Sequence, residues 1–371
     1  MANSRNKISF DAAEVVFMKI VFRVDSSLQI GSGHLMRCLT LAEQLKKENG
    51  SDVYFIMRDL SGNLIDLVKQ KKITVFELPQ VEPGEALAGY AKWLTVTQEQ
   101  DAAETIASIE IIGKPDILII DSYAIDITWE NMLRPYVEKI MVIDDLANRK
   151  HDCDILLDQN EYRNKDKRYE YLVSQHCQLL LGPQHAILRE EFYEERKKIR
   201  VRDGKINNIL VFFGGSDTGN ETMKALQAIS MLELNDITVN VIVGKSNPNQ
   251  KEIEKFCDKN NNMHYFCQVD NIAEFMNAAD LAIGAGGTIT WERCFLGLPA
   301  IVVAIADNQV ELTEACASKG ILVFLGDKST VTTPLLSQAI LNIEGRTLKK
   351  IAQNCLDEGK DYGRRNIFAS S

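Results

Sequence analysis

One histidine near the start of the chain lies at a position suited to a catalytic base. His34 follows Gly31 and Gly33, where an apolar run ends and a helical pattern begins. A helix that starts after a strand presents unpaired backbone N–H groups to a ligand, and an imidazole there can accept a proton near neutral pH. A histidine that only caps the helix or packs in a cleft is the alternative. With glycines before it and Arg37 one turn later, the pattern favours the base.

Two charged residues precede this loop, at the end of the first predicted strand. Arg23 and Asp25 follow apolar residues of the strand predicted over residues 18–24. We expect both to reach the same cleft edge as His34. Asp25 would then orient the imidazole or bind an N–H or hydroxyl group of a substrate, in a role secondary to that of the histidine.

Three glycine-containing loops follow predicted strands in the second half of the chain. They lie at Gly214–Gly215, at Gly244 and at Gly284–Gly287. Glycine lets the backbone approach a ligand closely. None of the loops matches the Walker pattern, and none fits the dinucleotide fingerprint GxGxxG with a following acidic residue. An NAD-dependent oxidoreductase is therefore disfavoured, although it would share a two-domain α/β architecture.

The last of these loops leads directly into a helix that carries a carboxylate. Gly286, Gly287 and Thr288 precede the helix, and Glu292 lies one turn into it. The positive end of the helix favours a bound phosphate, and a carboxylate at that place can accept both hydroxyls of a ribose. The loop therefore suggests a ribose diphosphate site. A glutamate that is merely solvated on the helix surface is the alternative.

Strand-like and helix-like stretches alternate along the whole chain, which predicts parallel sheets covered by helices. In the first half we predict strands at residues 18–24, 52–57, 73–78, 116–121, 139–144, 154–157 and 178–181. In the second half we predict strands at residues 209–213, 237–243, 265–268 and 281–283, and another that begins at Pro299. The fold class is therefore α/β, with two Rossmann-like domains that face each other across a cleft.

A polar stretch divides the two halves. Residues 199–208 are poor in apolar side chains and contain a glycine, so we place the linker there. The predicted parts are an N-terminal extension over residues 1–17, an N-terminal α/β domain over residues 18–200 that carries His34, and a C-terminal α/β domain over residues 201–371 that binds the nucleotide. Residues 1–17 lack the pattern of a secretory signal.

Composition excludes several classes of function. The chain has 371 residues, of which 45% are hydrophobic and 25% charged, and a net charge of −10. That charge disfavours a nucleic-acid partner, and the longest apolar runs have the length of strands rather than of membrane helices. The eight cysteines are scattered without a CxxC pair, which is typical of a reduced, cytoplasmic protein.

The sequence predicts neither a metal nor a cofactor. It has no HxH or HExxH motif and no DxD-type pair flanked by strand ends. Asp144 and Asp145 are adjacent rather than spaced, so we expect a turn at a strand end. Without a metal, backbone amides at a helix end would stabilise a departing diphosphate, while His34 would activate water.

Several segments together resemble a known enzyme family. They are FRVDSSLQIGSGHLMRCLTLAEQL, IIDSYAID, VIDDLA, CDILLDQN, GPQHAILREEF and the region GAGGTITWE…GLPAIVV…DNQ. From Met18 to about Leu325 the chain resembles the metal-independent UDP-sugar hydrolases of the pseudaminic acid pathway. The resemblance implies the GT-B fold of glycosyltransferases and hydrolytic removal of UDP from UDP-2,4-diacetamido-2,4,6-trideoxy-β-L-altropyranose. A looser similarity extends to the lipid II synthase glycosyltransferase.

The resemblance also implies roles for individual residues. His34 matches the catalytic histidine of the family, and Tyr123 matches a tyrosine near the sugar. The resemblance implies that Gly286, Gly287, Thr288 and Glu292 bind UDP and that Tyr123, Asn308 and Gln309 contact the substrate. From their places in or beside the predicted loops, we also assign Gly214 to the UDP site and Arg23, Asp25 and Gly33 to the substrate site. The expected partner is a UDP-sugar, with a monomer favoured. A GT-B glycosyltransferase with a UDP-amino-sugar donor is the alternative, but we find no amphipathic stretch for a lipid acceptor.

Overall fold

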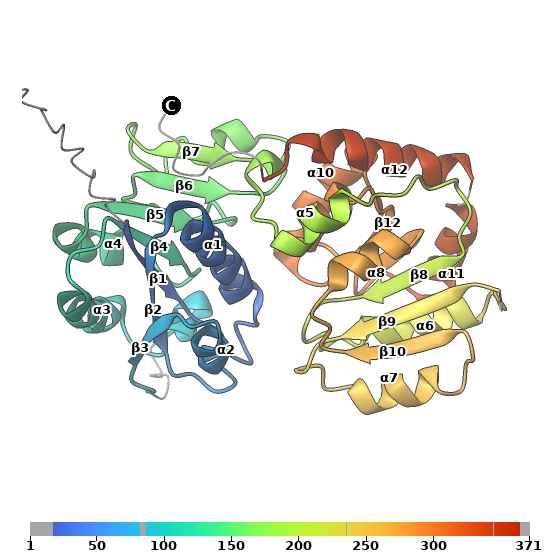
Figure 1. Ribbon diagram of the computed structural model, residues 1–371, viewed down its shortest axis with the longest axis horizontal. Helices are drawn as coiled ribbons and strands as arrows, with labels where there is room; N and C mark the ends of the chain where they lie inside the picture. Colours follow the sequence, from blue (N-terminus) through green and yellow to red (C-terminus); the bar gives the residue numbers. More distant parts are fainter. Residues whose placement is uncertain (1–17, 82–86, 235, 344, 364–371) are drawn as a thin grey trace, which may run out of the picture.

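A computed structural model describes residues 18–81, 87–234, 236–343 and 345–363, so the predicted extension over residues 1–17 lies outside the described part. Two parallel β-sheets, one of seven strands and one of six, form the centres of two α/β halves. Figure 1 shows the halves side by side along the long axis of the molecule. The predicted fold class is confirmed.

The first sheet has the strand order β3-β2-β1-β4-β5-β6-β7, and every pair is parallel. Its strands are β1 (Lys19–Val24), β2 (Asp52–Arg58), β3 (Thr74–Leu78), β4 (Ile117–Asp121), β5 (Lys139–Ile143), β6 (Ile155–Asp158) and β7 (Gln178–Leu181). The helical segments are α1 (Gly33–Asn49), α2 (Ile65–Gln70), η1 (Gly89–Trp93), α3 (Gln98–Ile112), α4 (Ile127–Leu133), η2 (Arg134–Tyr136), η3 (Lys165–Lys167) and η4 (Pro183–His185). The seven predicted strands are confirmed to within one residue at each end.

The order of the strands reverses between β1 and β4. The chain builds outward from β1 to β3 and then returns to place β4 on the other side of β1. In parallel α/β sheets a crevice opens at the carboxyl ends of such a pair, and ligands bind there. The loop that contains His34 follows β1 and therefore lies at this crevice.

Side chains of the strands alternate between two apolar faces. On β1, Ile20 and Phe22 pack on the face that α1 covers, whereas Val21 packs on the face that α3 and α4 cover. On β4, Ile117 and Ile119 lie on the α1 face. Because successive side chains of a strand point to opposite faces, this alternation decides which polar side chains at the carboxyl edge meet α1.

The second sheet repeats the arrangement, with the parallel order β10-β9-β8-β11-β12-β13 and a reversal between β8 and β11. Its strands are β8 (Asn208–Phe212), β9 (Thr238–Val243), β10 (Met263–Cys267), β11 (Leu281–Ala285), β12 (Ala300–Ala304) and β13 (Val323–Asp327). The helical segments are α5 (Glu190–Arg196), α6 (Glu221–Ser230), α7 (Gln250–Cys257), α8 (Ile272–Ala278), α9 (Ile289–Phe295), η5 (Asp307–Gln309), α10 (Val310–Ser318), α11 (Thr333–Asn342), α12 (Arg346–Glu358) and η6 (Gly359–Asp361). Strand β13 was not predicted, because this half-buried edge strand holds only three apolar residues before a glycine.

Helix α5 packs with the second half of the molecule, although the predicted boundary at residue 200 assigned it to the first. It contacts α8 and α9, and Figure 1 shows it beside α8. Phe192 is fully buried in the core of the second half, and the Arg196 guanidinium lies 5.1 Å from the centre of the Phe295 ring. Helix α5 thus packs as part of the second half, while the domain boundary at residue 200 stays a prediction.

The predicted linker over residues 199–208 is also attached to the second half. Arg202 is buried, and its guanidinium donates hydrogen bonds to backbone carbonyls near the ends of α8 and α9, among them Ala279 O and Leu296 O. The last carbonyls of a helix have no partner within the helix, so a buried arginine can satisfy them. A polar composition therefore marked an anchored segment here rather than a free linker. Among the residues that the structure describes, no helix is long and apolar enough to cross a membrane.

Candidate active site

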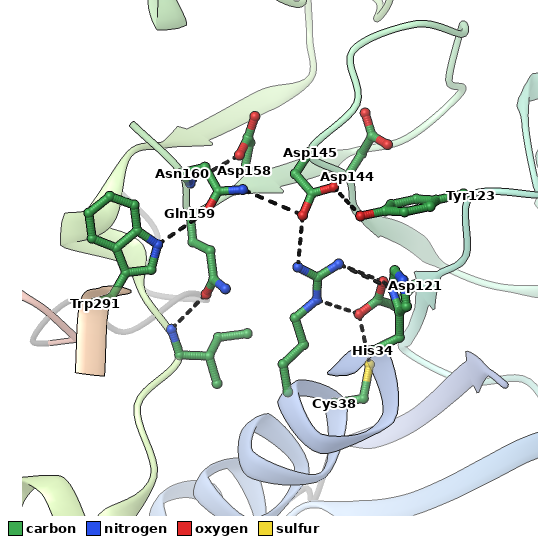
Figure 2. A network of polar contacts seen from close by, with 12 residues as sticks. His34, Cys38, Asp121, Tyr123, Asp144, Asp145, Asp158, Gln159, Asn160 and Trp291 are labelled. Atoms are coloured by element: carbon green, nitrogen blue, oxygen red, sulfur yellow. Dashed lines mark hydrogen bonds and ion pairs between the residues drawn. The ribbon is translucent and has the colours of Figure 1, made fainter. Parts of the chain in front are cut away.

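His34 contacts a carboxylate from the central strand β4. Its Nδ1 atom lies 2.6 Å from Asp121 Oδ1, and the imidazole side chain is 10% exposed. Figure 2 shows the pair beside the first turn of α1. Asp121 has the same parity on β4 as Ile117 and Ile119, so its side chain lies on the α1 face. The strand thus delivers the carboxylate to the helix start.

Arg37 holds this carboxylate from the other side. Its Nε atom donates to Asp121 Oδ2 at 2.6 Å, and its Nη2 atom donates to Asp121 Oδ1 at 2.8 Å. His34 and Arg37 are three residues apart and therefore share one face of α1. A bidentate arginine fixes both the position and the charge of a carboxylate.

The electrostatics of this group decide which nitrogen of His34 is basic. Burial alone would raise the pKa of Asp121, but the charges of Arg37 and His34 outweigh burial and hold that pKa well below its usual range. Asp121 is therefore an anion at neutral pH and accepts a hydrogen bond from Nδ1–H of the imidazole. The lone pair of the neutral ring then lies on Nε2, which is the nitrogen left to act as a base.

A second carboxylate connects Arg37 with Tyr123. Asp145 Oδ2 lies 3.3 Å from Arg37 Nη1, and the Tyr123 hydroxyl donates to Asp145 Oδ1 at 2.5 Å (Figure 2). Burial, followed by the negative charge of Asp145, raises the pKa of Tyr123 well above its usual value, so this phenol stays protonated. The expected strand-end turn at Asp144 and Asp145 thus contributes a side chain to the network.

The structure does not bring Arg23 or Asp25 to His34, and the expectation that it would is wrong. Arg23 shares the parity of Val21 and points to the face opposite α1, where its Nη2 atom lies 2.6 Å from Asp101 Oδ2. Asp25 pairs with Arg23 Nη1 at 2.7 Å and accepts from the backbone N–H of Arg58. Both residues are buried, and Asp121 holds the imidazole instead.

The glycine loop after β11 is closely packed. A Cβ atom on Gly286 would lie 2.7 Å from Thr313 Oγ1, and Gly287 has a φ of +93° that favours glycine. Thr288 is exposed at the start of α9. Gly214, which follows β8, also has a positive φ, of +91°. Both loops lie at the reversal point of the second sheet, where an α/β sheet binds its ligand.

Glu292 is half-buried one turn into α9 and is paired with an arginine. Arg189 Nη2 lies 3.0 Å from Glu292 Oε1, and Arg189 Nη1 lies 2.7 Å from Glu191 Oε1. The arginine comes from the segment just before α5, where the chain enters the second half. Arg189 thus holds the predicted ribose-binding carboxylate of Glu292 in place. The pairing uses Oε1 of Glu292 and leaves Oε2 for a ligand.

The two predicted half-sites lie close to each other. A Cβ atom on Gly215 would lie 3.4 Å from Ser32 Oγ, and Ser32 is the residue at the N-cap position of α1, two residues before His34. Gly33 is exposed at this point. The first glycine loop of the second half therefore approaches the helix start of the first half, close to His34.

The other predicted substrate residues follow β12. Gln309 lies against the glycine loop, because a Cβ atom on Gly287 would lie 3.7 Å from its Nε2 atom, while its Oε1 atom accepts from the backbone N–H of Ile305. Asn308 is exposed in the same short helix, η5. The amide nitrogen of Gln309 is therefore placed to donate to a molecule on the loop.

A buried contact joins the network around His34 to helix α9. Trp291 Nε1 donates to Asn160 Oδ1 at 3.1 Å, and Asn160 Nδ2 lies 3.4 Å from Asp145 Oδ2 (Figure 2). Trp291 precedes Glu292 in α9. The helix of the predicted nucleotide site is therefore connected through Trp291 and Asn160 to Asp145, which contacts Arg37 beside His34. No group of three or more His, Cys, Asp or Glu residues suited to a metal ion occurs in the part of the chain that the structure describes.

Comparison with known sequences identifies the family. Residues 209–353 match the glycosyltransferase family 28 C-terminal domain. The chain is 33% identical over 304 residues to the UDP-2,4-diacetamido-2,4,6-trideoxy-beta-L-altropyranose hydrolase of Campylobacter jejuni, an alignment that covers 82% of this chain and 97% of that protein. The chain belongs to this hydrolase family. The resemblance inferred from the sequence motifs is thereby confirmed.

Solved structures agree on the fold of this hydrolase family member. MurG of Acinetobacter baumannii superposes with a TM-score of 0.61 at 15% identity, over 92% of this chain and 95% of that one. TcCGT1 in complex with UDP superposes with a TM-score of 0.66 at 11% identity, over 94% and 95% of the two chains. The family member therefore has the two-domain arrangement of these proteins.

Sequence reasoning missed Asp121 and Asp145, although a signal for both was present. Asp121 ends one predicted strand and Asp145 directly follows another, at residues 116–121 and 139–144. Carboxyl ends of parallel strands meet at one edge of a sheet, so both carboxylates were bound to lie near the loop after β1. Trp93, whose ring lies beside His34, carried no comparable signal, because it follows β3 in a short 3₁₀ segment.

Proposed function

We propose that this protein hydrolyses UDP-2,4-diacetamido-2,4,6-trideoxy-β-L-altropyranose to UDP and the free sugar, as a step of pseudaminic acid biosynthesis. Membership of the hydrolase family supports the reaction. The observation that carries the mechanism is the pair of His34 and Asp121, 2.6 Å apart, at the start of α1 and the carboxyl end of β4. A UDP-sugar is the substrate, and the monomeric state remains a prediction.

In the proposed reaction His34 is the general base. Water attacks the anomeric carbon while the bond from that carbon to the phosphate oxygen breaks and its electron pair leaves with UDP. The proton of the water passes to Nε2 of His34, and Asp121 stabilises the imidazolium that forms. Attack from the face opposite the diphosphate inverts the anomeric centre.

UDP is placed on the second half of the molecule. Backbone N–H groups around Gly286 and Gly287 would hold the diphosphate, and Glu292 would accept the ribose hydroxyls. The positive φ of Gly287 and the close packing at Gly286 support this role, because both features keep side chains out of the loop. Gln309 and Asn308 would contact the phosphate or the sugar from the neighbouring η5.

The experiment is UDP release from a panel of UDP-sugars without an acceptor. We expect release of UDP from the diacetamido-trideoxy sugar, both with and without excess chelator. NMR should show that the free sugar first forms with inverted anomeric configuration. His34→Asn should lose about 10²–10⁴-fold in kcat and keep its affinity for UDP. The exposed His176→Asn is the control and should retain full activity.

Four results would contradict the proposed function or its mechanism. If His34→Asn turned over at the parental rate, His34 would not be the general base. A product of retained configuration would indicate a covalent route. Release that needs both an acceptor sugar and the protein would make it a glycosyltransferase. Loss of activity on chelation, restored by a divalent cation, would contradict the metal-independent mechanism alone.

A further inference from the structure

Two aromatic rings contact His34 on the first half of the molecule, and a third packs against both of them. The imidazole meets Trp93 and Tyr123 edge to face, with ring centres 5.6 and 4.6 Å away. Trp93 stacks on Tyr123 at 5.2 Å, and Tyr90 contacts both of these rings at 4.9 and 5.1 Å. We call Tyr90, Trp93 and Tyr123 the ring cluster. Tyr123 has a predicted place near the sugar, whereas nothing so far assigns a role to the other two.

The rings of this cluster, rather than their polar atoms, are what a ligand would meet. The Tyr123 hydroxyl is held by Asp145 at 2.5 Å, so it points into the protein. Trp93 is half-buried, and Tyr90 is 40% exposed, which is high for a large aromatic side chain in contact with two other rings. The cluster thus presents an apolar surface at the carboxyl edge of the sheet, directly beside the proposed base.

The position of the base fixes where the reacting sugar lies. A general base acts on a water molecule within hydrogen-bond reach, and that water must be in contact with the anomeric carbon. The pyranose ring is therefore held within a few ångström of His34. Trp93 and Tyr123 contact the imidazole, so the ring cluster lies within reach of a sugar placed for reaction.

We propose that Tyr90 and Trp93 complete, with Tyr123, an apolar subsite that selects 6-deoxy, N-acetylated sugars. This inference rests on the proposed function. A diacetamido-trideoxy sugar carries three methyl groups, one on each acetamido group and one at C6. Aromatic faces receive such groups well, whereas a hydroxyl pressed against them loses water without gaining a hydrogen bond.

The test compares two substrates that differ at one position, the UDP-diacetamido-trideoxy sugar and its analogue with a hydroxyl at C6. An apolar pocket discriminates against an added hydroxyl by roughly 10²-fold in kcat/KM, and we expect a preference of that order in the parent protein. Tyr90→Ala and Trp93→Ala should reduce the ratio to less than about tenfold, with Trp93→Phe between them and the parent. The affinity for UDP, measured by calorimetry, should not change.

Tyr136→Ala is the matched control. Tyr136 is 36% exposed, close to Tyr90, but it precedes β5 and so lies at the amino edge of the sheet, away from His34. Its substitution should leave the ratio unchanged. Trp93 also packs against the core of the first half, so Trp93→Ala could unfold the protein. In that case Tyr90→Ala alone tests the apolar subsite.

The outcomes separate this inference from the proposed function. If the parent releases no UDP from the trideoxy sugar, the proposed function fails. If it does, but Tyr90→Ala keeps the parental ratio or slows both substrates equally, the apolar subsite is refuted and the hydrolase stands. A parent that accepts both substrates equally would also refute the subsite.

Discussion

At the scale of single residues, the active site depends on a carboxylate that never gains a proton. Asp121 is buried, yet Arg37 and His34 hold its pKa well below the usual range. Its anion is therefore constant at every pH at which the protein would work. Acidification should lower kcat, because a protonated His34 has no lone pair for the water proton.

Asp121→Asn tests this arrangement. An amide can donate as well as accept, so the proton of His34 is no longer directed to Nδ1 and the neutral ring loses its preferred tautomer. We expect kcat to fall by about 10²-fold or more, with KM and the affinity for UDP close to those of the parent. Steady-state kinetics and calorimetry measure both. Unchanged kcat would show that His34 does not need this partner.

A second buried carboxylate makes stability depend on pH. Burial and the negative charge of Asp145 raise the pKa of Asp158 to about 8. The folded protein therefore keeps a proton on Asp158 that the unfolded chain releases above about pH 4. Because the native state binds the extra proton, this group lowers the free energy of unfolding as the pH rises from about 4 to about 8.

Asp158→Asn should remove that dependence. Between about pH 5 and pH 7, the free energy of unfolding of the variant relative to the parent should rise by roughly 1.4 kcal/mol per pH unit. Urea unfolding of both proteins at two pH values gives the difference, and other titrating groups cancel in it. Parallel profiles would show that Asp158 is ionised in the folded protein.

At the scale of elements, two helix starts carry the site. Helix α1 presents His34 and Arg37 on one face, and α9 presents Glu292 behind a glycine loop. Both follow the strand at which their sheet reverses direction, namely β1 and β11. The repeated α/β arrangement thus places the proposed base in one half and the proposed UDP site in the other.

Glu292→Ala tests the second of these sites. Loss of the carboxylate removes the acceptor for the ribose and leaves Arg189 without one of its two partners. We expect the affinity for UDP to weaken by about 1–3 kcal/mol in calorimetry. Glu314→Ala, on the exposed side of α10, is the control and should bind UDP as the parent does. Equal affinity of the Glu292 variant and the parent would exclude the assigned ribose contact.

At the scale of the whole molecule, the two halves are joined through buried polar contacts near the site. Trp291 of α9 donates to Asn160, whose amide nitrogen approaches Asp145, and Asp145 contacts Arg37. Helix α9 and the side chains that hold His34 are therefore parts of one network. Figure 2 shows its course from the indole to the imidazole.

Trp291→Phe should reveal whether this contact matters for turnover. The substitution keeps an apolar ring but removes the N–H donor, so Asn160 Oδ1 loses its partner across the interface. We expect kcat to fall roughly fivefold, the equivalent of about 1 kcal/mol, with UDP affinity unchanged. Trp129→Phe is the control, because it removes an indole donor inside the first half only. Equal effects of both variants on kcat would mean that the loss is general.

Local patterns in the sequence determined most of the architecture. Continuous apolar runs such as Ile117–Ile120 and the glycines that follow strands are local signals, and so the strands, the two α/β halves and the loops at His34 and Gly286 could be predicted. The motifs also indicated the family. The short edge strand β13 could not be predicted, because its few apolar residues show little periodicity.

Only the tertiary structure decided which side chains meet. Asp25 is nine residues from His34 yet faces away from it, whereas Asp121 is 87 residues away and lies 2.6 Å from its ring. The choice depends on strand order and on the parity of side chains along parallel strands, which pairing across the sheet sets and sequence distance does not. The same reason applies to α5, whose polar surroundings suggested a boundary but whose Phe192 lies in the core of the second half.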